Sequence, residues 1–292
     1  MIPPVLQEEI ERSLVEKFKI PYSVLKIQPV GGGCINNAHK LETKHGSFFL
    51  KWNDAKHFPK MFNAEAAGLT LLRSTNTIYI PEVIVESEAA EKSFLILEWI
   101  EPEKKQKKFW VDFGKKLALL HLHTSNYFGL EYDNYIGSFH QSNKQGSSWI
   151  DFFFSERIEP LLKRAIDQHK LSNRLIIKSA GLFKTLPEIL PEENPSLLHG
   201  DLWPGNYLVG PDGFSCLIDP AVYFGHREMD LAMTRLFGGF DLEFYRSYDE
   251  TFPLEKNWKS RVDIHNLYPL LVHVNLFGGG YAQEVNSILS RF

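Results

Sequence analysis

The sequence predicts an α+β protein of two lobes, in which a strand-rich first third precedes a mainly helical remainder. Short apolar runs typical of strands are concentrated before residue 100, whereas apolar residues three and four positions apart dominate the chain beyond it. We therefore expect residues 1–98 to form the first lobe and residues 99–292 the second. With 292 residues, of which 43% are hydrophobic, the chain is long enough to bury a substantial core.

Each lobe is predicted from its own run of elements. In the first lobe, residues 5–20 and 63–74 have helical apolar spacing, and strands are expected at residues 24–30, 38–43, 47–52, 83–86 and 94–97. The lysine-rich residues 103–108 fit a solvated connector. In the second lobe, helices are expected over residues 109–123, 149–168 and 172–186, and again from Asp230 to the end.

Composition excludes several classes of partner. The net charge of −4 gives no basic bias toward nucleic acid or an anionic membrane surface. No apolar run approaches the ~18 residues needed to span a bilayer, and residues 1–9 lack the pattern of a signal peptide. Only two cysteines occur, Cys34 and Cys216, and Cys216 lies in an apolar run typical of a buried site. We expect a cytoplasmic protein that binds neither nucleic acid nor membranes.

The most informative segment runs from residue 198 to residue 219. Asp201 stands five residues before Asn206 and 18 residues before Asp219. The apolar pattern around them predicts a strand, a loop and a second strand. This spacing is typical of kinase-type phosphotransferases, in which one aspartate orients the acceptor hydroxyl and takes its proton. The asparagine and the second aspartate hold Mg²⁺ against the ATP phosphates. The sequence thus predicts Asp201 as catalytic and Asn206 with Asp219 as metal ligands.

Residues that would handle the nucleotide phosphates precede this segment. Glycines at 31–33 (Gly31, Gly32 and Gly33) lie between two predicted strands, where backbone N–H groups can approach phosphate oxygens. Lys51 stands on an otherwise apolar strand and needs an anion, and Glu65 in the next helix is its expected partner. Taken singly, these residues also fit a flexible turn, an edge-strand lysine and a surface carboxylate. Their order along the chain favours phosphate binding.

The predicted junction of the lobes holds Glu98, Trp99 and Ile100. By its order along the chain, this segment is where an adenine ring would bind main-chain groups between apolar side chains. The side chains themselves add little to this prediction.

With these motifs, the chain resembles the fructosamine-kinase family (ketosamine-3-kinases), which is related to aminoglycoside and choline phosphotransferases. The resemblance runs nearly end to end and is carried by residues 31–37, 133–137, 199–203, 218–221, 225–233 and 275–281. One departure from protein kinases is that Asp219 is followed by Pro220 and Ala221 instead of Phe-Gly. This departure is typical of small-molecule kinases.

The resemblance implies a protein-kinase-like fold, with a small antiparallel-sheet N-lobe and a larger, mainly helical C-lobe. It implies an ATP- and Mg²⁺-dependent enzyme that phosphorylates the 3-hydroxyl of fructosamine, ribulosamine or erythrulosamine adducts. The amine would be a small molecule or a glycated protein lysine, and the activity would serve deglycation repair. Alternatives are a kinase for an aminoglycoside or choline, or a nucleotide-binding pseudokinase. The intact Lys51, Asp201, Asn206 and Asp219 count against a pseudokinase.

Trp203 and Cys34 each have two interpretations. Trp203, two residues after Asp201, is either a core residue or, as its position beside Pro204 and Gly205 favours, a substrate-stacking residue. Cys34 follows the three glycines and is either a small turn residue or a redox-sensitive thiol.

Histidines and one aspartate near the motif are assigned structural roles. His121 and His123 are two residues apart on a predicted helix, so they point in different directions and cannot share a metal ion. Helical spacing places His121 on the packed face. The resemblance implies that His199 and Asp230 support the catalytic loop, and Asp230 also fits a helix N-cap. No metal site made by protein ligands alone is expected.

Overall fold

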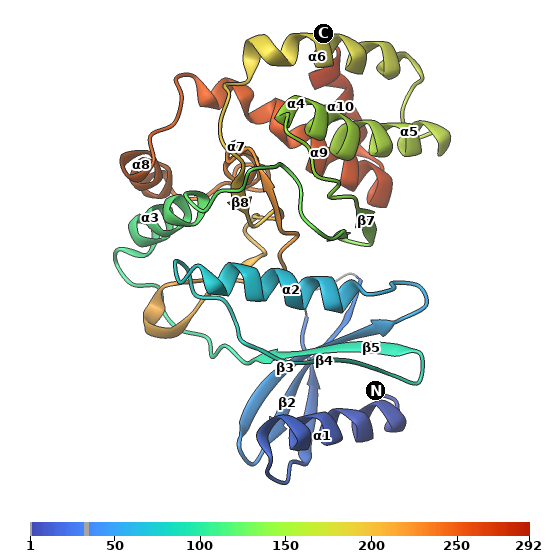
Figure 1. Ribbon diagram of the computed structural model, residues 1–292, viewed down its shortest axis with the longest axis vertical. Helices are drawn as coiled ribbons and strands as arrows, with labels where there is room; N and C mark the ends of the chain where they lie inside the picture. Colours follow the sequence, from blue (N-terminus) through green and yellow to red (C-terminus); the bar gives the residue numbers. More distant parts are fainter. Residues whose placement is uncertain (1, 32–34) are drawn as a thin grey trace. The chain divides into compact units, whose positions relative to one another are not determined.

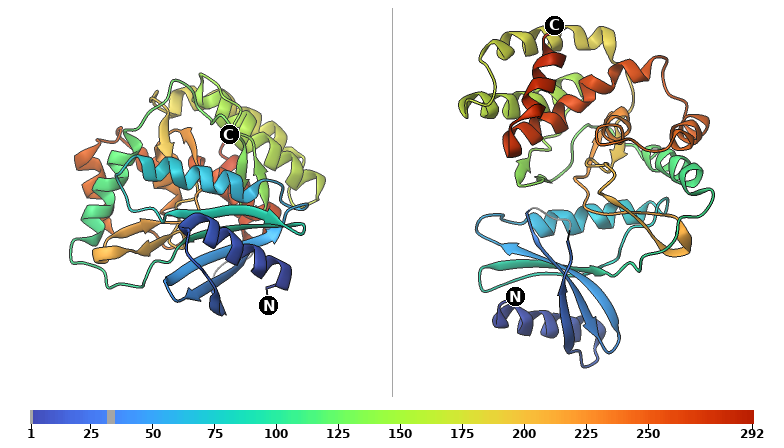
Figure 2. Two further views of the ribbon diagram at one scale, coloured as in Figure 1. Left: turned by 60° about the horizontal axis from the view of Figure 1, so that its bottom comes forward. Right: turned by 180° about the vertical axis from the view of Figure 1, so that it is seen from behind.

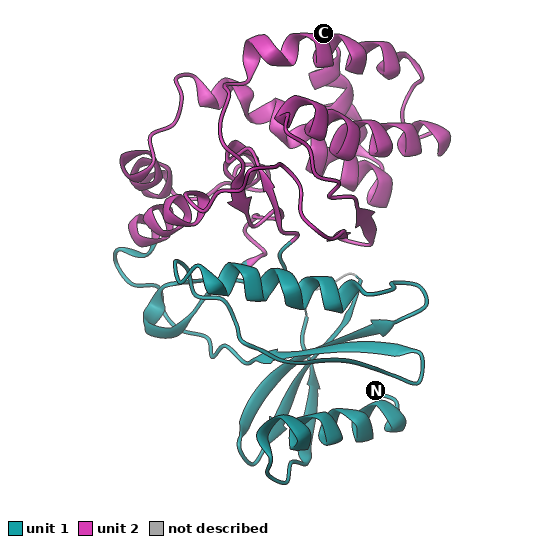
Figure 3. Ribbon diagram, viewed as in Figure 1, with its two compact units in different colours: residues 1–109, 207–220 teal, residues 110–206, 221–292 magenta. Residues whose placement is uncertain are grey.

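The computed structural model describes residues 2–31 and 35–292. Two compact units emerge, one of residues 1–109 and 207–220, the other of residues 110–206 and 221–292 (Figure 3). This division differs from the boundary expected at residues 98 and 99. The first unit runs further, and it takes in a later segment because the N–H of Leu217 donates to the carbonyl of Tyr79 (3.0 Å). Sequence order alone does not reveal such a return of the chain.

A five-stranded antiparallel sheet forms the centre of the first unit, with strand order β1-β2-β3-β5-β4. The strands are β1 (Val24–Pro29), β2 (Asn37–Thr43), β3 (Gly46–Asp54), β4 (Val83–Ala89) and β5 (Lys92–Glu98). Helix α1 (Pro4–Phe18) packs on one face of the sheet and α2 (Met61–Ser74) on the other (Figure 1). The predicted helices and strands of this region are all present, with small shifts at their ends.

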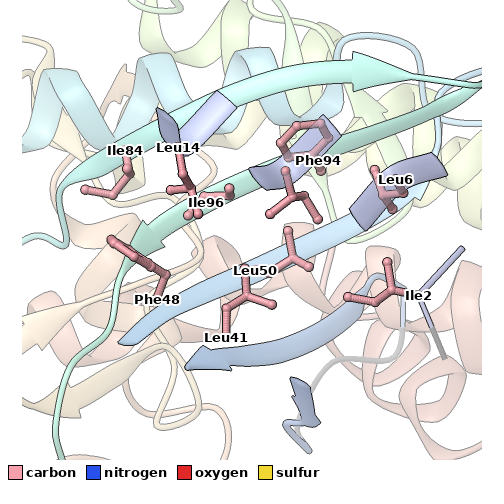
Figure 4. Packing of buried hydrophobic residues seen from close by; sticks show 10 residues of the cluster. Ile2, Leu6, Leu14, Leu41, Phe48, Leu50, Ile84, Phe94 and Ile96 are labelled. Atoms are coloured by element: carbon pink, nitrogen blue, oxygen red, sulfur yellow. The ribbon is translucent and has the colours of Figure 1, made fainter. Parts of the chain in front are cut away.

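Side chains of β3 point alternately to the two faces of the sheet, so the apolar core residues lie on one face and Lys51 lies on the other. Phe48 and Leu50 belong to the hydrophobic cluster beneath α1, with residues such as Leu14, Leu41 and Ile96 (Figure 4). Because successive side chains point to opposite faces, Lys51 lies on the side of the sheet that α2 covers. One face of β3 thus stabilises the unit while the other presents a buried lysine.

A short hairpin completes the first unit. It contains β9 (Tyr207–Val209), the 3-10 helix η2 (Pro211–Gly213) and β10 (Ser215–Leu217). Cys216 is fully buried here, as predicted, and burial raises the pKa of its thiol to about 12. The thiol is therefore protonated at neutral pH and behaves as a small apolar side chain.

The second unit is mainly helical (Figure 2). Its helices are α3 (Phe109–His121), α4 (Trp149–Phe152), the π-helix η1 (Phe153–Ile158), α5 (Glu159–Asp167), α6 (Arg174–Ile189), α7 (Glu228–Met233), α8 (Leu242–Thr251), α9 (Trp258–Phe277) and α10 (Gly280–Leu289). Helix α9 is buried along most of its length and packs against α5, α7 and α10. Within the described residues, no helix combines the length and apolar character needed to cross a membrane. The predicted α+β class is confirmed.

Two short strand pairs lie among these helices. Strand β8 (Ser196–Leu198) pairs with β11 (Tyr223–Gly225), and β6 (Asn134–Ile136) pairs with β7 (Phe139–Gln141). The second pair was not predicted, because its strands are three residues long and carry buried polar side chains. Asn134 donates to the carbonyl of Val222 (2.7 Å) and Gln141 to that of Ala221 (3.2 Å), so partners distant in sequence replace the usual apolar pattern.

Buried ion pairs link the start of α7 to α9 and to residue 193. Glu228 accepts hydrogen bonds from Arg261 Nε (2.8 Å) and Nη2 (2.5 Å), and Arg227 pairs with both oxygens of Glu193. Burial alone would raise the pKa of Glu228, but bonding to Arg261 and His265 lowers it to about 2. Paired charges are therefore buried in this region at neutral pH.

His226 should make stability depend on pH. Its ring is fully buried, and burial, together with the neighbouring His265, lowers its pKa from 6.5 to about 4. The unfolded chain therefore binds the proton more readily, so stability falls as the pH drops from about 6.5 toward about 4. We expect His226 to contribute a loss of about 2 kcal/mol between pH 7 and pH 5, measured by urea unfolding.

The matched controls separate this effect from general acid sensitivity. His226→Gln should be less stable at neutral pH but show a flatter pH dependence, whereas His123→Gln, at an exposed position, should follow the wild type. An unchanged slope in His226→Gln would contradict the assignment.

Candidate active site

The loop between β8 and β9 is closed by the side chain of Asn206. Its Nδ2 donates to both the carbonyl oxygen and Oδ2 of Asp201, each at 2.8 Å. Two backbone bonds, from Trp203 N to Asp201 O (3.2 Å) and from Asn206 N to Trp203 O (2.9 Å), tighten the turn. The five-residue spacing thus fixes the orientation of the Asp201 carboxylate.

Asp230 stabilises this loop by accepting hydrogen bonds from two of its backbone N–H groups. Its Oδ2 accepts the N–H of His199 (2.8 Å) and its Oδ1 accepts the N–H of Gly200 (2.9 Å). Burial alone would raise its pKa, but His121 and the bonded N–H groups lower it, so the carboxylate is charged. The implied brace is confirmed. The N-cap interpretation is wrong, because Asp230 lies inside α7, whose N-cap residue is Arg227.

Two histidines complete the support. His121 Nε2 lies 3.2 Å from Asp230 Oδ2, and its Nδ1 lies 2.7 Å from the hydroxyl of Tyr248. The predicted structural role of His121 is therefore confirmed. His199, also fully buried, accepts the N–H of Asp201 at Nδ1 (3.3 Å), which fits its predicted role in holding the loop backbone.

Gly200 is required by both its conformation and its surroundings. Its φ is +82°, and a Cβ there would lie 2.0 Å from the carbonyl oxygen of Ala221. The N–H of Ala221 also donates to the carbonyl of His199 (2.9 Å). The segment after Pro220 is thus packed directly on the loop between β8 and β9, and only glycine permits this approach.

In the first unit, Lys51 is buried between two carboxylates. Its Nζ lies 2.8 Å from Glu65 Oε1 and 2.6 Å from Asp219 Oδ1. The expected pair with Glu65 is formed, while the contact with Asp219, 168 residues away, was not anticipated. The side chain of Asp219 is 42% exposed, against 7% for Lys51, so the pair presents a carboxylate to solvent.

Electrostatics keep this lysine charged. Burial alone would lower the pKa of Lys51, but Asp219 and Glu65 together raise it above its usual value. Asp219 itself has a φ of +55°, in the left-handed region, where non-glycine residues are uncommon. Strained backbone of this kind is concentrated at functional sites.

Other predicted nucleotide-binding residues have mixed outcomes. Gly31 is exposed, whereas Gly32, Gly33 and Cys34 lie outside the described residues. The carboxylate of Glu98 accepts the hydroxyl of Tyr79 (2.5 Å) and the N–H of Glu82 (3.1 Å), so its side chain has a structural task.

Trp99 and Ile100, which follow Glu98 in the chain, are half-buried. Lys40 Nζ lies 4.4 Å from the ring centre of Trp99. The prediction that adenine binds main-chain groups near Glu98, Trp99 and Ile100 stays a prediction.

The candidate magnesium ligands have suitable chemistry. Asp219 in the first unit and Asn206 in the second each offer oxygen donors, which Mg²⁺ prefers. Among the described residues, His226, Glu228 and His265 also have ligand atoms within 4.8 Å of one another. That group does not fit a metal ion, because Arg261 bonds both oxygens of Glu228. In addition, His226 Nδ1 accepts the N–H of Glu228, which leaves the ring proton on Nε2.

Trp203 is half-buried and lies against its own loop. A Cβ on Gly205 would meet its ring at 2.3 Å, and the ring centre of Phe237 is 5.8 Å away. Trp203 is thus not a core residue. Its predicted contact with substrate stays a prediction.

The architecture belongs to a known class. A spectinomycin phosphotransferase solved with ADP and spectinomycin matches 99% of this chain, over 92% of its own, with a TM-score of 0.60 at 15% identity. The chain therefore has the kinase-like phosphotransferase fold.

Family membership is more specific. The family model described as fructosamine kinase matches residues 6–292. A "Probable ketoamine kinase" of Enterococcus faecium is 38% identical over 91% of this chain and 95% of its own length. An Arabidopsis thaliana protein-ribulosamine 3-kinase, chloroplastic, is 37% identical over 92% and 83%. A solved "Putative fructosamine-3-kinase" from Haemophilus somnus has a TM-score of 0.88 at 30% identity, over 98% and 99%. The chain belongs to the fructosamine kinase family, as the sequence motifs indicated.

Proposed function

We propose that this protein is an ATP-dependent ketosamine 3-kinase, which transfers a phosphoryl group to the 3-hydroxyl of a fructosamine, ribulosamine or erythrulosamine adduct. The observation that carries the proposal is the pairing of buried Lys51 with Glu65 and Asp219 in a member of this family. Relatives of this chain bear the names ketoamine kinase and protein-ribulosamine 3-kinase. The acceptor is therefore a small ketosamine or a glycated protein lysine.

Each polar group has a role in this reaction. Asp201, oriented by Asn206, accepts the proton of the acceptor hydroxyl, so that the oxygen can attack the γ-phosphorus of ATP and displace ADP. Lys51, kept protonated by its two carboxylates, neutralises phosphate charge. Asn206 and Asp219 would hold Mg²⁺, which neutralises charge on the β- and γ-phosphates when bound. Gly31, with Gly32 and Gly33, would contact the phosphates.

The remaining assignments concern the two substrates. Main-chain groups near Glu98, Trp99 and Ile100 would bind adenine, and Trp203 would stack on the sugar. A 3-phosphorylated adduct eliminates readily and releases the amine, so the reaction serves deglycation. We place the activity in the cytoplasm, where ATP is available.

Two alternative functions make different predictions. A nucleotide-binding pseudokinase would bind ATP without turnover, and the intact Lys51, Asp201, Asn206 and Asp219 argue against it. An aminoglycoside or choline kinase shares the fold, as the spectinomycin phosphotransferase does, but at 15% identity the likeness extends to the fold alone.

A substrate panel tests the proposal. With purified protein, Mg²⁺ and ATP, kcat/KM for ribulose- or fructose-derived lysine adducts should exceed that for kanamycin or choline by about 10²-fold or more. ADP release measures turnover, and phosphorus NMR locates the new phosphate on the 3-hydroxyl. The same adducts on a glycated protein would show whether the amine is free or protein-bound. Faster turnover of kanamycin would contradict the ketosamine assignment but not the kinase one.

A further inference from the structure

Five ring-bearing side chains form a continuous cluster in the second unit, which we call the aromatic surface. They are Trp203, Phe237, His273, Phe277 and Tyr281. The ring centre of His273 lies 5.0, 5.7 and 4.9 Å from those of Phe237, Phe277 and Tyr281, respectively. Phe237 in turn contacts Trp203 at 5.8 Å. Three separate parts of the chain therefore meet here.

These rings are not packed as a core. Phe277 is 59% exposed, and the other members are half-buried. Between Phe277 and Tyr281, Gly278 and Gly279 have φ of +68° and +67°, which disfavours side chains at both positions. Apart from their chain neighbours, no heavy atom of the described residues lies within 4 Å of where their Cβ atoms would be, so both positions border open space.

The electrostatic potential of the aromatic surface favours a positively charged ligand. Aromatic rings carry negative electrostatic potential on their faces and attract ammonium groups. His273 donates from Nδ1 to the carbonyl of Pro269 (2.7 Å), and burial lowers its pKa below the usual 6.5. The ring is therefore neutral at neutral pH and does not repel a positive ligand.

The aromatic surface is continuous with the catalytic loop. Trp203 is two residues from Asp201, and its N–H donates to the carbonyl oxygen of Asp201 (3.2 Å). A ligand whose hydroxyl reaches Asp201 therefore lies close to Trp203, the member of the aromatic surface that belongs to this loop. A ketosamine has a secondary amine, protonated at neutral pH, attached to a carbon close to the 3-hydroxyl.

We propose that the aromatic surface binds the protonated amine of the ketosamine and the carbon chain that it carries, and so determines which adducts are accepted. This inference rests on the proposed function. Phe277 and Tyr281 contribute ring faces to the ammonium group, while Trp203 contacts the sugar. Specificity for an amine-linked sugar then includes cation–π attraction to these rings.

A matched pair of acceptors isolates the ammonium group. N-butylfructosamine is cationic, and 1-O-butylfructose replaces its amine by a neutral ether oxygen. Wild-type protein should favour the amine by about 2- to 30-fold in kcat/KM, the range that cation–π attraction supplies. Phe277→Leu and Tyr281→Leu keep apolar volume but remove a ring, so each should reduce this ratio through KM for the amine.

Two further variants serve as controls. Tyr281→Phe keeps the ring and should keep the ratio. Tyr127→Leu removes a ring that is 51% exposed and outside the aromatic surface, and it should match the wild type. The KM for ATP and the melting temperature of each variant report on general damage, which would not alter the ratio between two acceptors.

The outcomes separate the two proposals. Turnover of N-butylfructosamine with an unchanged amine-to-ether ratio in the double variant Phe277→Leu/Tyr281→Leu would overturn this inference and leave the kinase assignment intact. If the wild type phosphorylates neither acceptor, the proposed function fails. Calorimetry then decides the inference: weaker binding of N-butylfructosamine by the double variant supports it, and equal or absent binding overturns it.

Discussion

Asp201→Asn is expected to reduce kcat by about 10²–10⁴-fold, because a positioned general base contributes that much to proton transfer. The amide keeps an oxygen that can accept from Asn206 Nδ2, which now lies 2.8 Å from Asp201 Oδ2, so the loop should stay closed. Nucleotide binding should be nearly unchanged, since the lysine and its carboxylate partners belong to the first unit. Steady-state kinetics and ATP titration of the purified variant measure both effects.

Asp167→Asn provides the matched control, because Asp167 is exposed at the end of α5. It should retain wild-type kcat. Near-normal turnover in Asp201→Asn, measured under the same conditions, would remove Asp201 from the proposed mechanism.

Asp219→Ala is expected to weaken both Mg·ATP binding and turnover. The variant loses a proposed metal ligand and also the carboxylate 2.6 Å from Lys51 Nζ, so Glu65 alone remains to hold the lysine. We expect the Mg²⁺ concentration for half-maximal nucleotide binding to rise by about 10- to 100-fold or more. Nucleotide binding titrated against Mg²⁺ measures this change.

Asp219→Asn and Glu88→Ala refine the test. Asp219→Asn keeps an oxygen donor without its charge and should fall between the wild type and Asp219→Ala. Glu88 is an exposed carboxylate of β4 in the same unit, and its removal should have no effect. An identical metal dependence in wild type and Asp219→Ala would show that Asp219 does not hold the metal.

Local chemistry explains why some contacts of the candidate site could be predicted. Asp201 and Asn206 are five residues apart because an asparagine at that position can bond back to the aspartate and close the loop. Lys51 required an anion because it stands in an apolar strand, and Glu65 in the following helix supplies one. Strand and helix periodicity placed most elements for the same reason, since each depends on residues close in sequence.

Local patterns failed where partners come from elsewhere in the chain. The sequence around Asp230 predicts a helix N-cap, yet its carboxylate accepts hydrogen bonds from backbone N–H groups about 30 residues earlier. The strands of the β6–β7 pair are too short and too polar to show a period of two, because their side chains bond to the carbonyls of Ala221 and Val222.

By itself, the sequence determined the α+β class, the family and the spacing of Asp201, Asn206 and Asp219, since these depend on neighbouring residues and their order. Only the tertiary structure decided that Asp219 pairs with Lys51, and that residues 207–220 join the first unit. It also decided that rings from residues 203, 237 and 273–281 share one surface. The physical reason is that side chains act through space at distances of a few ångströms, and chain folding alone sets which distant residues come that close.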